Sequence, residues 1–149
     1  MNLRQARKME LSELNALCMR WKAHWGYDDA FMAACRAELT LGPHDLDENL
    51  MRVAEEEGAP VGVAQISLQG GWAELENLFV EPAHMGRGVG RALFEWAAQA
   101  ARGAGATSMN IASDPAAAPF YRRMGARDAG TAPSTAIAGR ELPRLILTL

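Results

Sequence analysis

The chain has 149 residues, 49% hydrophobic and 22% charged, which is typical of one soluble globular domain, here residues 1–149. Its formal charge of −3 argues against a nucleic-acid partner, because such proteins usually carry a basic surface. No apolar run is long enough for a transmembrane helix, so we expect no membrane partner.

The localisation follows from the start of the chain and from its cysteines. The first residues contain no apolar core of a secretion signal. Cys18 and Cys35 are isolated and form no CxxC pattern, which favours two reduced, buried thiols over a disulfide or a metal site. We therefore expect a cytoplasmic protein that binds no metal.

The N-terminal third is expected to be mostly helical. A short strand is expected over residues 2–8. Apolar residues then recur at helical spacing from Leu11 to about Gly26, namely Leu14, Leu17, Cys18, Trp21 and Trp25. Asp28 or Asp29 would cap a second helix that ends before Gly42-Pro43, and residues 44–50 are interpreted as a linker.

The rest of the chain is expected to consist mainly of strands, with two helices between them. Residues 50–80 contain three strands separated by turns at 57–58 and 69–71, and a helix follows Pro82 and ends at Gly103. A strand over 106–112, a short helix closed by Gly125 and a C-terminal hairpin complete the pattern. This order favours a mixed α/β sheet over a Rossmann fold, which would alternate strand and helix from the start.

Three alternating glycines, Gly86, Gly88 and Gly90, stand where a strand runs into a helix. Such a turn exposes free backbone N–H groups at the positive end of the helix dipole, and this arrangement binds phosphate. Arg87 and Arg91 add cationic side chains. The alternative is a tight corner without a ligand. A Walker motif is excluded because Arg91-Ala92 follows Gly90, and a dinucleotide fingerprint is excluded because residue 91 is not glycine.

Two stretches carry a resemblance to a known family. "LFVEPAHMGRGVGRAL" followed by "DPAAAPFYRRMGA" is similar to the paired motifs of the GNAT superfamily of acetyl-CoA-dependent N-acetyltransferases. The resemblance covers essentially the whole chain. It implies a mixed, mostly antiparallel sheet flanked by helices, in the order β-α-α-β-β-β-α-β-α-β-β. A Gly-Arg-x-Leu-Pro stretch near the end is similar to an uncharacterised bacterial subgroup, which names no substrate.

The resemblance also implies a site for acetyl-CoA as co-substrate. The residues expected there are Leu78, Phe79, Val80, Met85, Gly86, Arg87, Gly88, Val89, Gly90, Arg91, Asp114, Ala117 and Phe120. Two of them depart from the family pattern. Met85 stands where Arg or Gln is usual, and Asp114 stands where Asn is common. We expect Asp114 to cap the helix that begins at Pro115.

For catalysis, the resemblance makes Tyr121 the general acid that protonates the leaving thiolate of coenzyme A. The alternative is a core aromatic residue beside Phe120. Strand alternation places Glu74 and Glu76 on one face together with Trp72, Leu78 and Val80, and puts Ala73, Leu75, Asn77 and Phe79 on the other. Glu76 is the first candidate for the base and Glu74 the second, and the alternative is that both carboxylates face solvent.

The acceptor site is expected around the first turn between helices. Trp21, Trp25, Tyr27 and Phe31 would form an aromatic wall for a cationic amine, although the two tryptophans also fit a core position. Arg140 would hold an acceptor carboxylate, or else lie in solvent. The expected function is acetyl transfer to a primary amine of a small molecule. A protein or peptide acceptor, a non-catalytic acyl-CoA-binding module and a homodimer stay open.

Overall fold

The computed structural model describes residues 1–149 and contains one seven-stranded sheet in the order β1-β2-β3-β4-β5-β7-β6. All neighbouring strands are antiparallel except β4 and β5. The mixed, mostly antiparallel sheet that the resemblance implied is confirmed. The strands are β1 (Asn2–Gln5), β2 (Leu50–Glu56), β3 (Ala59–Leu68), β4 (Ala73–Val80), β5 (Ser108–Ala112), β6 (Arg127–Pro133) and β7 (Glu141–Thr148).

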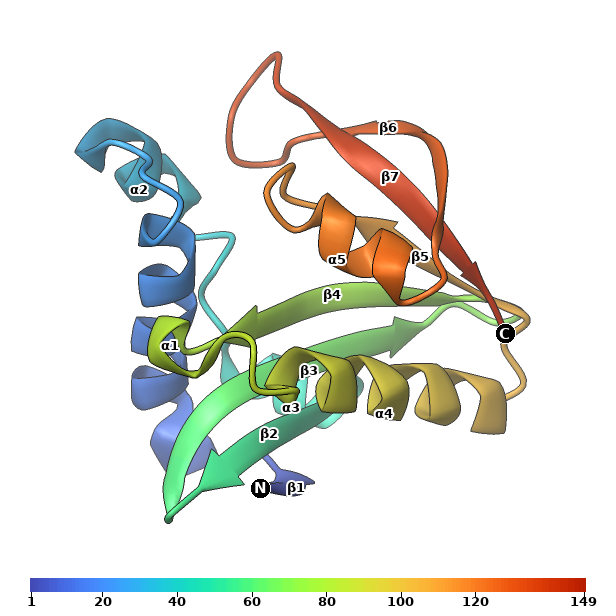
Figure 1. Cartoon of the computed structure of the whole chain (residues 1–149), viewed down its shortest axis with the longest axis horizontal. Coiled ribbons are helices and arrows are strands. Elements are labelled where there is room, and N and C mark those ends of the chain that lie inside the picture. The colour runs from blue at the N-terminus through green and yellow to red at the C-terminus, as the bar shows by residue number, and fades with distance from the viewer.

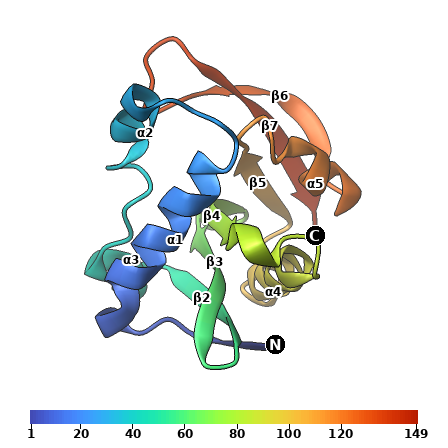
Figure 2. The same cartoon turned by 60° about the vertical axis from the view of Figure 1, so that its left-hand side comes forward.

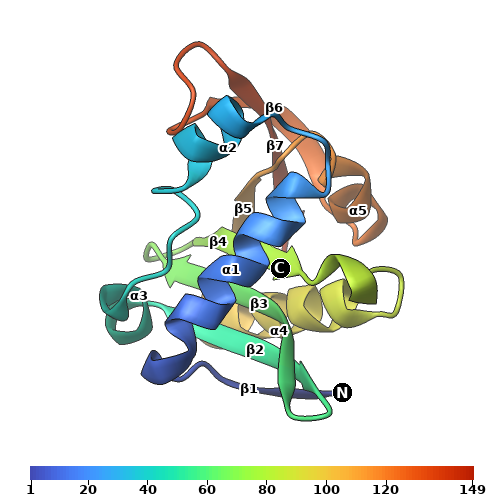
Figure 3. The ribbon, with the colours of Figure 1, turned by 90° about the vertical axis from the view of Figure 1, so that its left-hand side faces the viewer.

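Helices cover both faces of the sheet. Figure 3 shows α1 (Leu11–Ala23) crossing in front of β2–β4, with α4 (Val89–Gly103) behind them. Each of these helices packs on its own hydrophobic core. The core under α1 also contains Cys35 of α2 (Asp29–Cys35). In Figure 1, α5 (Ala118–Arg123) lies beside β5–β7 in the upper part of the molecule.

The first predicted strand was too long. The first strand ends at Gln5 and not at residue 8, because a 3₁₀ turn, η1 (Lys8–Glu10), follows it. The Glu10 carboxylate fixes this turn by accepting the Arg7 N–H at 2.7 Å and two hydrogen bonds from Arg4.

The linker expected over residues 44–50 is instead a short helix, α3 (Pro43–Glu48). Pro43 occupies its first turn, and the Asp45 carboxylate accepts the Gly42 N–H at 2.7 Å. Six residues are too few for helical periodicity to become visible in the sequence, so only the capping residues could have revealed this helix.

The sheet opens beside β4. Pairing between β4 and β5 is limited to Ala73 with Met109 and Glu74 with Asn110. From Leu75 to Val80 the edge of β4 that faces β5 therefore has no strand partner. This opening lies between the part of the sheet formed by β1–β4 and the part formed by β5–β7 (Figure 2). Helix α5 and the first turn of α4 approach each other there.

A β-bulge also interrupts β4. Gln65 pairs with Asn77 and Ile66 pairs with Leu75, so Glu76 is an extra residue without a partner on β3. The strict alternation expected for this strand was therefore wrong. Leu78 and Val80 join Ala73 and Leu75 in the core under α4, whereas Phe79 lies in the core under α1.

Candidate active site

A cavity of about 520 Å³ lies between the glycine turn and α5, and we call it the glycine-turn cavity. Of the thirteen residues expected to bind acetyl-CoA, nine line it, together with Tyr121, Trp25, His84 and Arg123. These nine are Leu78, Val80, Met85, Gly86, Gly88, Gly90, Arg91, Ala117 and Phe120. The two motifs identified in the sequence thus face the same space.

The three glycines serve two different purposes. Gly86 and Gly88 have φ angles of 78° and 86°, which L side chains rarely adopt, and no atom would lie within 4 Å of an added Cβ. At Gly90, by contrast, a Cβ would lie 3.3 Å from the Phe120 ring. Gly90 therefore permits close packing of α4 against α5, while Gly86 and Gly88 shape the open turn.

The turn has the features that a phosphate site needs. Gly88 is the N-cap of α4 and no side chain caps this helix, so its first N–H groups remain available to an anion. Arg91 lines the same cavity. The unpaired edge of β4 at Leu78 and Val80 offers backbone groups to the amide-containing arm of the coenzyme.

Four of the expected coenzyme residues lie elsewhere. Val89 is buried in the core, so only its backbone can face the cavity. Arg87 lines a different depression near β1 and the β2–β3 turn. Phe79 and Asp114 line a second cavity. Met85, although it lines the glycine-turn cavity, packs against both hydrophobic cores, which explains why an apolar residue fits there.

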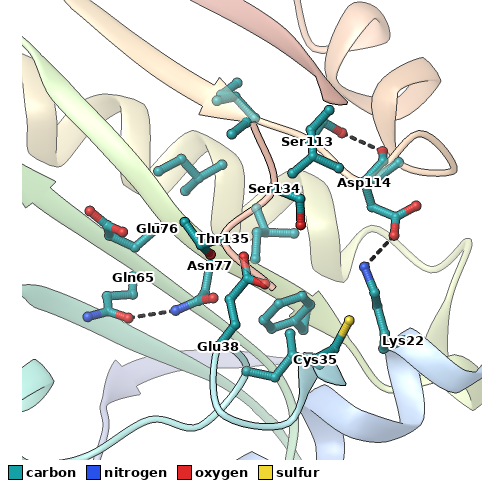
Figure 4. Close-up of a pocket in the computed structure, with 18 of the residues that line it drawn as sticks. Lys22, Cys35, Glu38, Gln65, Glu76, Asn77, Ser113, Asp114, Ser134 and Thr135 are labelled. Atoms are coloured by element: carbon teal, nitrogen blue, oxygen red, sulfur yellow. Dashed lines mark hydrogen bonds and ion pairs between the residues drawn. The ribbon is translucent and has the colours of Figure 1, made fainter. Parts of the chain in front are cut away.

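The second cavity has a volume of about 490 Å³ and lies over the bulged part of β4 (Figure 4). We call it the β4 cavity. Its walls come from α1, the segment from the end of α2 to α3, strands β3 and β4, the segment from β5 to α5, and the β6–β7 hairpin. Four residues line both cavities, namely Trp21, Leu78, Ala117 and Tyr121. Two molecules bound in the two cavities would therefore come into contact at these side chains.

Tyr121 is held rigidly at this junction. Its ring packs against Phe94 and Phe120, with centroids 5.9 and 5.2 Å away. The side chain is buried, its hydroxyl makes no hydrogen bond with the chain, and burial raises its pKa above the ordinary value for tyrosine. The phenol therefore stays protonated and keeps a proton to donate.

Both candidate carboxylates line the β4 cavity. Glu74 is half-buried and accepts a hydrogen bond from Asn110 at 2.6 Å, and burial raises its pKa, with a further rise from the nearby Glu76. Glu76, on the bulge, is exposed and accepts a hydrogen bond from Ser67 at 2.7 Å. The two carboxylates do share one side of the sheet, although they do not share it with Leu78 and Val80.

Sequence reasoning missed a polar chain beside these carboxylates. The Asn77 amide donates to Gln65 at 2.7 Å (Figure 4). Gln65 in turn donates to Asp45 of α3 at 2.9 Å. The bulge turns Asn77 toward this side, and α3 supplies Asp45. Neither the bulge nor α3 was expected from the sequence, so no signal pointed to this chain.

Asp114 does not cap α5, whose N-cap is Ala117. Its carboxylate accepts the Ala116 N–H at 2.8 Å, within the turn that precedes the helix. The other contacts of this carboxylate are to Lys22 at 2.6 Å, the Tyr27 hydroxyl at 3.0 Å and Arg140 at 3.9 Å. The capping prediction was wrong because the chain makes one more turn before α5 begins.

Of the expected aromatic wall only the two tryptophans line a cavity, and Tyr27 and Phe31 line neither of the two. Trp21 is buried and faces both, and Trp25 lines only the glycine-turn cavity. Tyr27 and Phe31 stack with centroids 4.1 Å apart, beneath Arg140. Arg140 lines the β4 cavity, and its Nη2 donates to the Tyr27 hydroxyl at 3.0 Å.

No group of three or more His, Cys, Asp and Glu side chains is arranged to hold a metal ion. None of the helices has both the length and the apolar character needed to cross a membrane.

Comparisons with known proteins agree with this geometry. No curated protein matches the sequence significantly. Among solved structures, a GCN5-related N-acetyltransferase from Rhodopseudomonas palustris is 21% identical, with a TM-score of 0.81 over 99% of this chain and 95% of that one. The PaiA N-acetyltransferase from Thermoplasma acidophilum, in complex with coenzyme A, is 15% identical, with a TM-score of 0.81 over 99% and 98% of the two chains.

A ribosomal-protein-alanine N-acetyltransferase from Brucella melitensis is 22% identical, with a TM-score of 0.70 over the full length of both chains. At these identities the likeness establishes the fold. The sequence profile of the acetyltransferase (GNAT) family matches residues 10–126. The chain therefore belongs to the GNAT family of acyl-CoA N-acyltransferases, which use acetyl-CoA as the acyl donor.

Proposed function

We propose that this enzyme transfers the acetyl group of acetyl-CoA directly to a primary amine of a small molecule. The observation that carries the proposal is the position of Tyr121, which lines both cavities and has a free hydroxyl. In this proposal the glycine-turn cavity holds the coenzyme and the β4 cavity holds the amine. The acetyl group crosses at the residues that the two cavities share.

The chemistry needs a base for the amine, donors for the developing oxyanion and an acid for the leaving thiolate. Acetyl-CoA, when bound, supplies the acyl group as a thioester. We assign the base to Glu76, acting directly or through water, because it is closer along β4 to Leu78 at the junction than Glu74 is. Glu74 is the second candidate, and Tyr121 is the acid.

The oxyanion donor is assigned to the backbone of residues 78–80. Beyond Glu74, β4 has no partner on its β5 side, so its outward N–H groups are free to donate. A donor on a strand that is paired with β3 along its other edge needs no reorganisation when charge develops.

The charges of the β4 cavity favour a basic acceptor. Glu38, Glu74 and Glu76 line it, and none has a cationic partner within 4 Å. The cations Lys22 and Arg140 are already held by Asp114 and Tyr27. This is why we no longer expect Arg140 to hold an acceptor carboxylate. A cavity of about 490 Å³ is also in the range typical of small ligands.

The reaction is tested by following thiol release from acetyl-CoA in the presence of n-butylamine, 1,4-diaminobutane, spermidine, L-lysine and an N-terminally free peptide. Turnover with the first four compounds and none with the peptide would support the proposal. Turnover with the peptide alone would replace the small molecule by a protein acceptor. The two buried free thiols fit a reducing compartment, so we place the reaction in the cytoplasm.

A further inference from the structure

The Asp114 carboxylate joins parts of the chain that are far apart in sequence. Its partners come from the last turns of α1, from the α1–α2 turn and from the β6–β7 loop, through Lys22, Tyr27 and Arg140 respectively. We propose that Asp114 is a positioning residue that fastens the β6–β7 loop to α1 and thereby fixes the wall of the β4 cavity. The inference rests on the assignment of that cavity to the amine acceptor.

The contacts are buried, which makes them strong candidates for a fixed arrangement. The Asp114 side chain is only 4% exposed, that of Lys22 10% and that of Arg140 20%. Burial alone would raise the pKa of the Asp114 carboxyl, but hydrogen bonds from Lys22, the Ala116 N–H and Tyr27, together with the charge of Lys22, hold this pKa below its ordinary value. Asp114 therefore carries its charge at neutral pH and can compensate the buried cations.

Aromatic stacking fixes the same arrangement from a second direction. The Tyr27 and Phe31 rings lie 4.1 Å apart, and both cations approach them. Lys22 Nζ is 5.1 Å from the Tyr27 centroid, and Arg140 Cζ is 4.8 Å from the Phe31 centroid. At these distances each cation is attracted by the rings as well as by the carboxylate.

The negative charge of Asp114 is what allows Lys22 and Arg140 to lie close together. One carboxylate faces two cations, so the group carries a net charge of +1. Without the carboxylate charge, two partly desolvated cations would share the same aromatic pair and repel each other. Such repulsion is stronger here than in bulk water because the effective dielectric constant is lower.

Of the two cations, Arg140 is the one that can move away from Asp114. It belongs to the loop between β6 and β7, whose other hydrogen bonds are internal, from Ser134 N to the Arg140 carbonyl and from Ala136 N and Ile137 N to Ser134 Oγ. The loop also packs Ala136 against the core under α1. Because Ser134 and Thr135 line the β4 cavity, displacement of this loop would change the acceptor wall and leave the glycine turn untouched.

The test uses Asp114→Asn, which removes the charge. It keeps one acceptor oxygen, in the place of Oδ1, for the Ala116 N–H and the Tyr27 hydroxyl, and replaces the Oδ2 that accepts from Lys22 by an amide nitrogen. Asp128→Asn is the matched control, because it removes the charge of an exposed aspartate that forms an ion pair with Arg122. The double variant Asp114→Asn/Lys22→Met restores the net charge of +1. Steady-state kinetics with 1,4-diaminobutane and hydrogen exchange of residues 134–140 are measured for all three.

We expect Asp114→Asn to raise the acceptor KM at least about tenfold, with the acetyl-CoA KM within about twofold of the parent enzyme. Hydrogen exchange of residues 134–140 should become faster. The double variant should recover part of both losses, which a merely structural hydrogen bond would not allow. Asp128→Asn should match the parent protein in both measurements.

An Asp114→Asn variant with unchanged acceptor KM and unchanged exchange would overturn the inference, as would a double variant worse than the single one. If no amine supports turnover in the parent enzyme, the proposed acceptor reaction fails. The exchange measurement alone then decides whether Asp114 fastens the loop, so the two failures are distinguishable.

Discussion

The two cavities that meet at Tyr121 are built in different ways. The glycine-turn cavity depends on backbone: two glycines with positive φ, an uncapped helix end and an unpaired strand edge. The β4 cavity depends on side chains from helices, strands and loops that are far apart in the sequence, and a buried carboxylate with two cations lies in its wall. Backbone donors can bind any coenzyme with the same phosphates and amides, whereas a side-chain wall can be rebuilt for a different acceptor.

This difference predicts that substitutions at the turn affect the coenzyme and that substitutions on β4 affect the chemistry of the amine. Gly88→Glu should have the largest effect. It puts a carboxylate at the positive end of α4 and a side chain at a φ of 86°. Binding of coenzyme A, measured by calorimetry, should weaken at least about a hundredfold.

The control for this prediction is Gly70→Glu in the β3–β4 turn. Gly70 has a φ of 85° and open space around it, as Gly88 does, but it lies away from both cavities. It should lose a similar amount of thermal stability and keep its affinity for coenzyme A. Equal affinity in both variants would show that the turn does not bind the phosphates.

Tyr121→Phe tests the junction of the two cavities. The hydroxyl has no partner in the chain, so its loss should leave the fold and the affinity for coenzyme A unchanged. If the phenol protonates the leaving thiolate, kcat should fall by roughly 10²-fold or more. An unchanged kcat in thiol-release assays would remove Tyr121 from the mechanism and leave it a packing residue.

Substitutions of the two β4 carboxylates should have smaller effects on activity. Glu76→Gln should lower kcat/KM by about 10²-fold and Glu74→Gln by about tenfold, if Glu76 is the base. A base must be unprotonated, so activity is lost as the pH falls through its pKa. Burial raises the pKa of Glu74 above its ordinary value of 4.5, so a base at Glu74 would shift the acidic limb of the pH profile upward.

The comparison of variants identifies the base. An acidic limb that persists in Glu76→Gln and disappears in Glu74→Gln would reverse the assignment. Two variants with parental activity would leave water or an unrelated group as the base.

The two cavities also differ in how much of each could be predicted from the sequence. The glycine turn was visible because its residues are adjacent in sequence. Tyr121 was recognised through a second local motif. The Asp114 contacts were not visible, since Lys22 and Arg140 lie 118 positions apart in the sequence and come together only in the fold, where Arg140 of the β6–β7 loop lies over the Phe31 ring of α2.

Within β4 the local pattern itself was misleading. A period of two holds up to Glu74, but the bulge at Glu76 moves each later residue of β4 to the opposite face of the sheet from the one that the period predicts. A bulge depends on the partner strand, because it is defined by two residues opposite one. The sequence of β4 alone therefore could not reveal that Asn77 faces the cavity.

The smallest effect is expected at Met85, where the sequence departs from the family pattern. Met85→Gln would place an amide donor in the glycine-turn cavity while removing apolar contacts with both cores. Because backbone N–H groups supply most of the phosphate contacts in such a turn, we expect less than about a tenfold gain in affinity for coenzyme A, accompanied by a lower Tm. A gain well above tenfold in calorimetry would mean that side chains, and not backbone, dominate coenzyme binding, and the contrast between the two cavities would no longer hold.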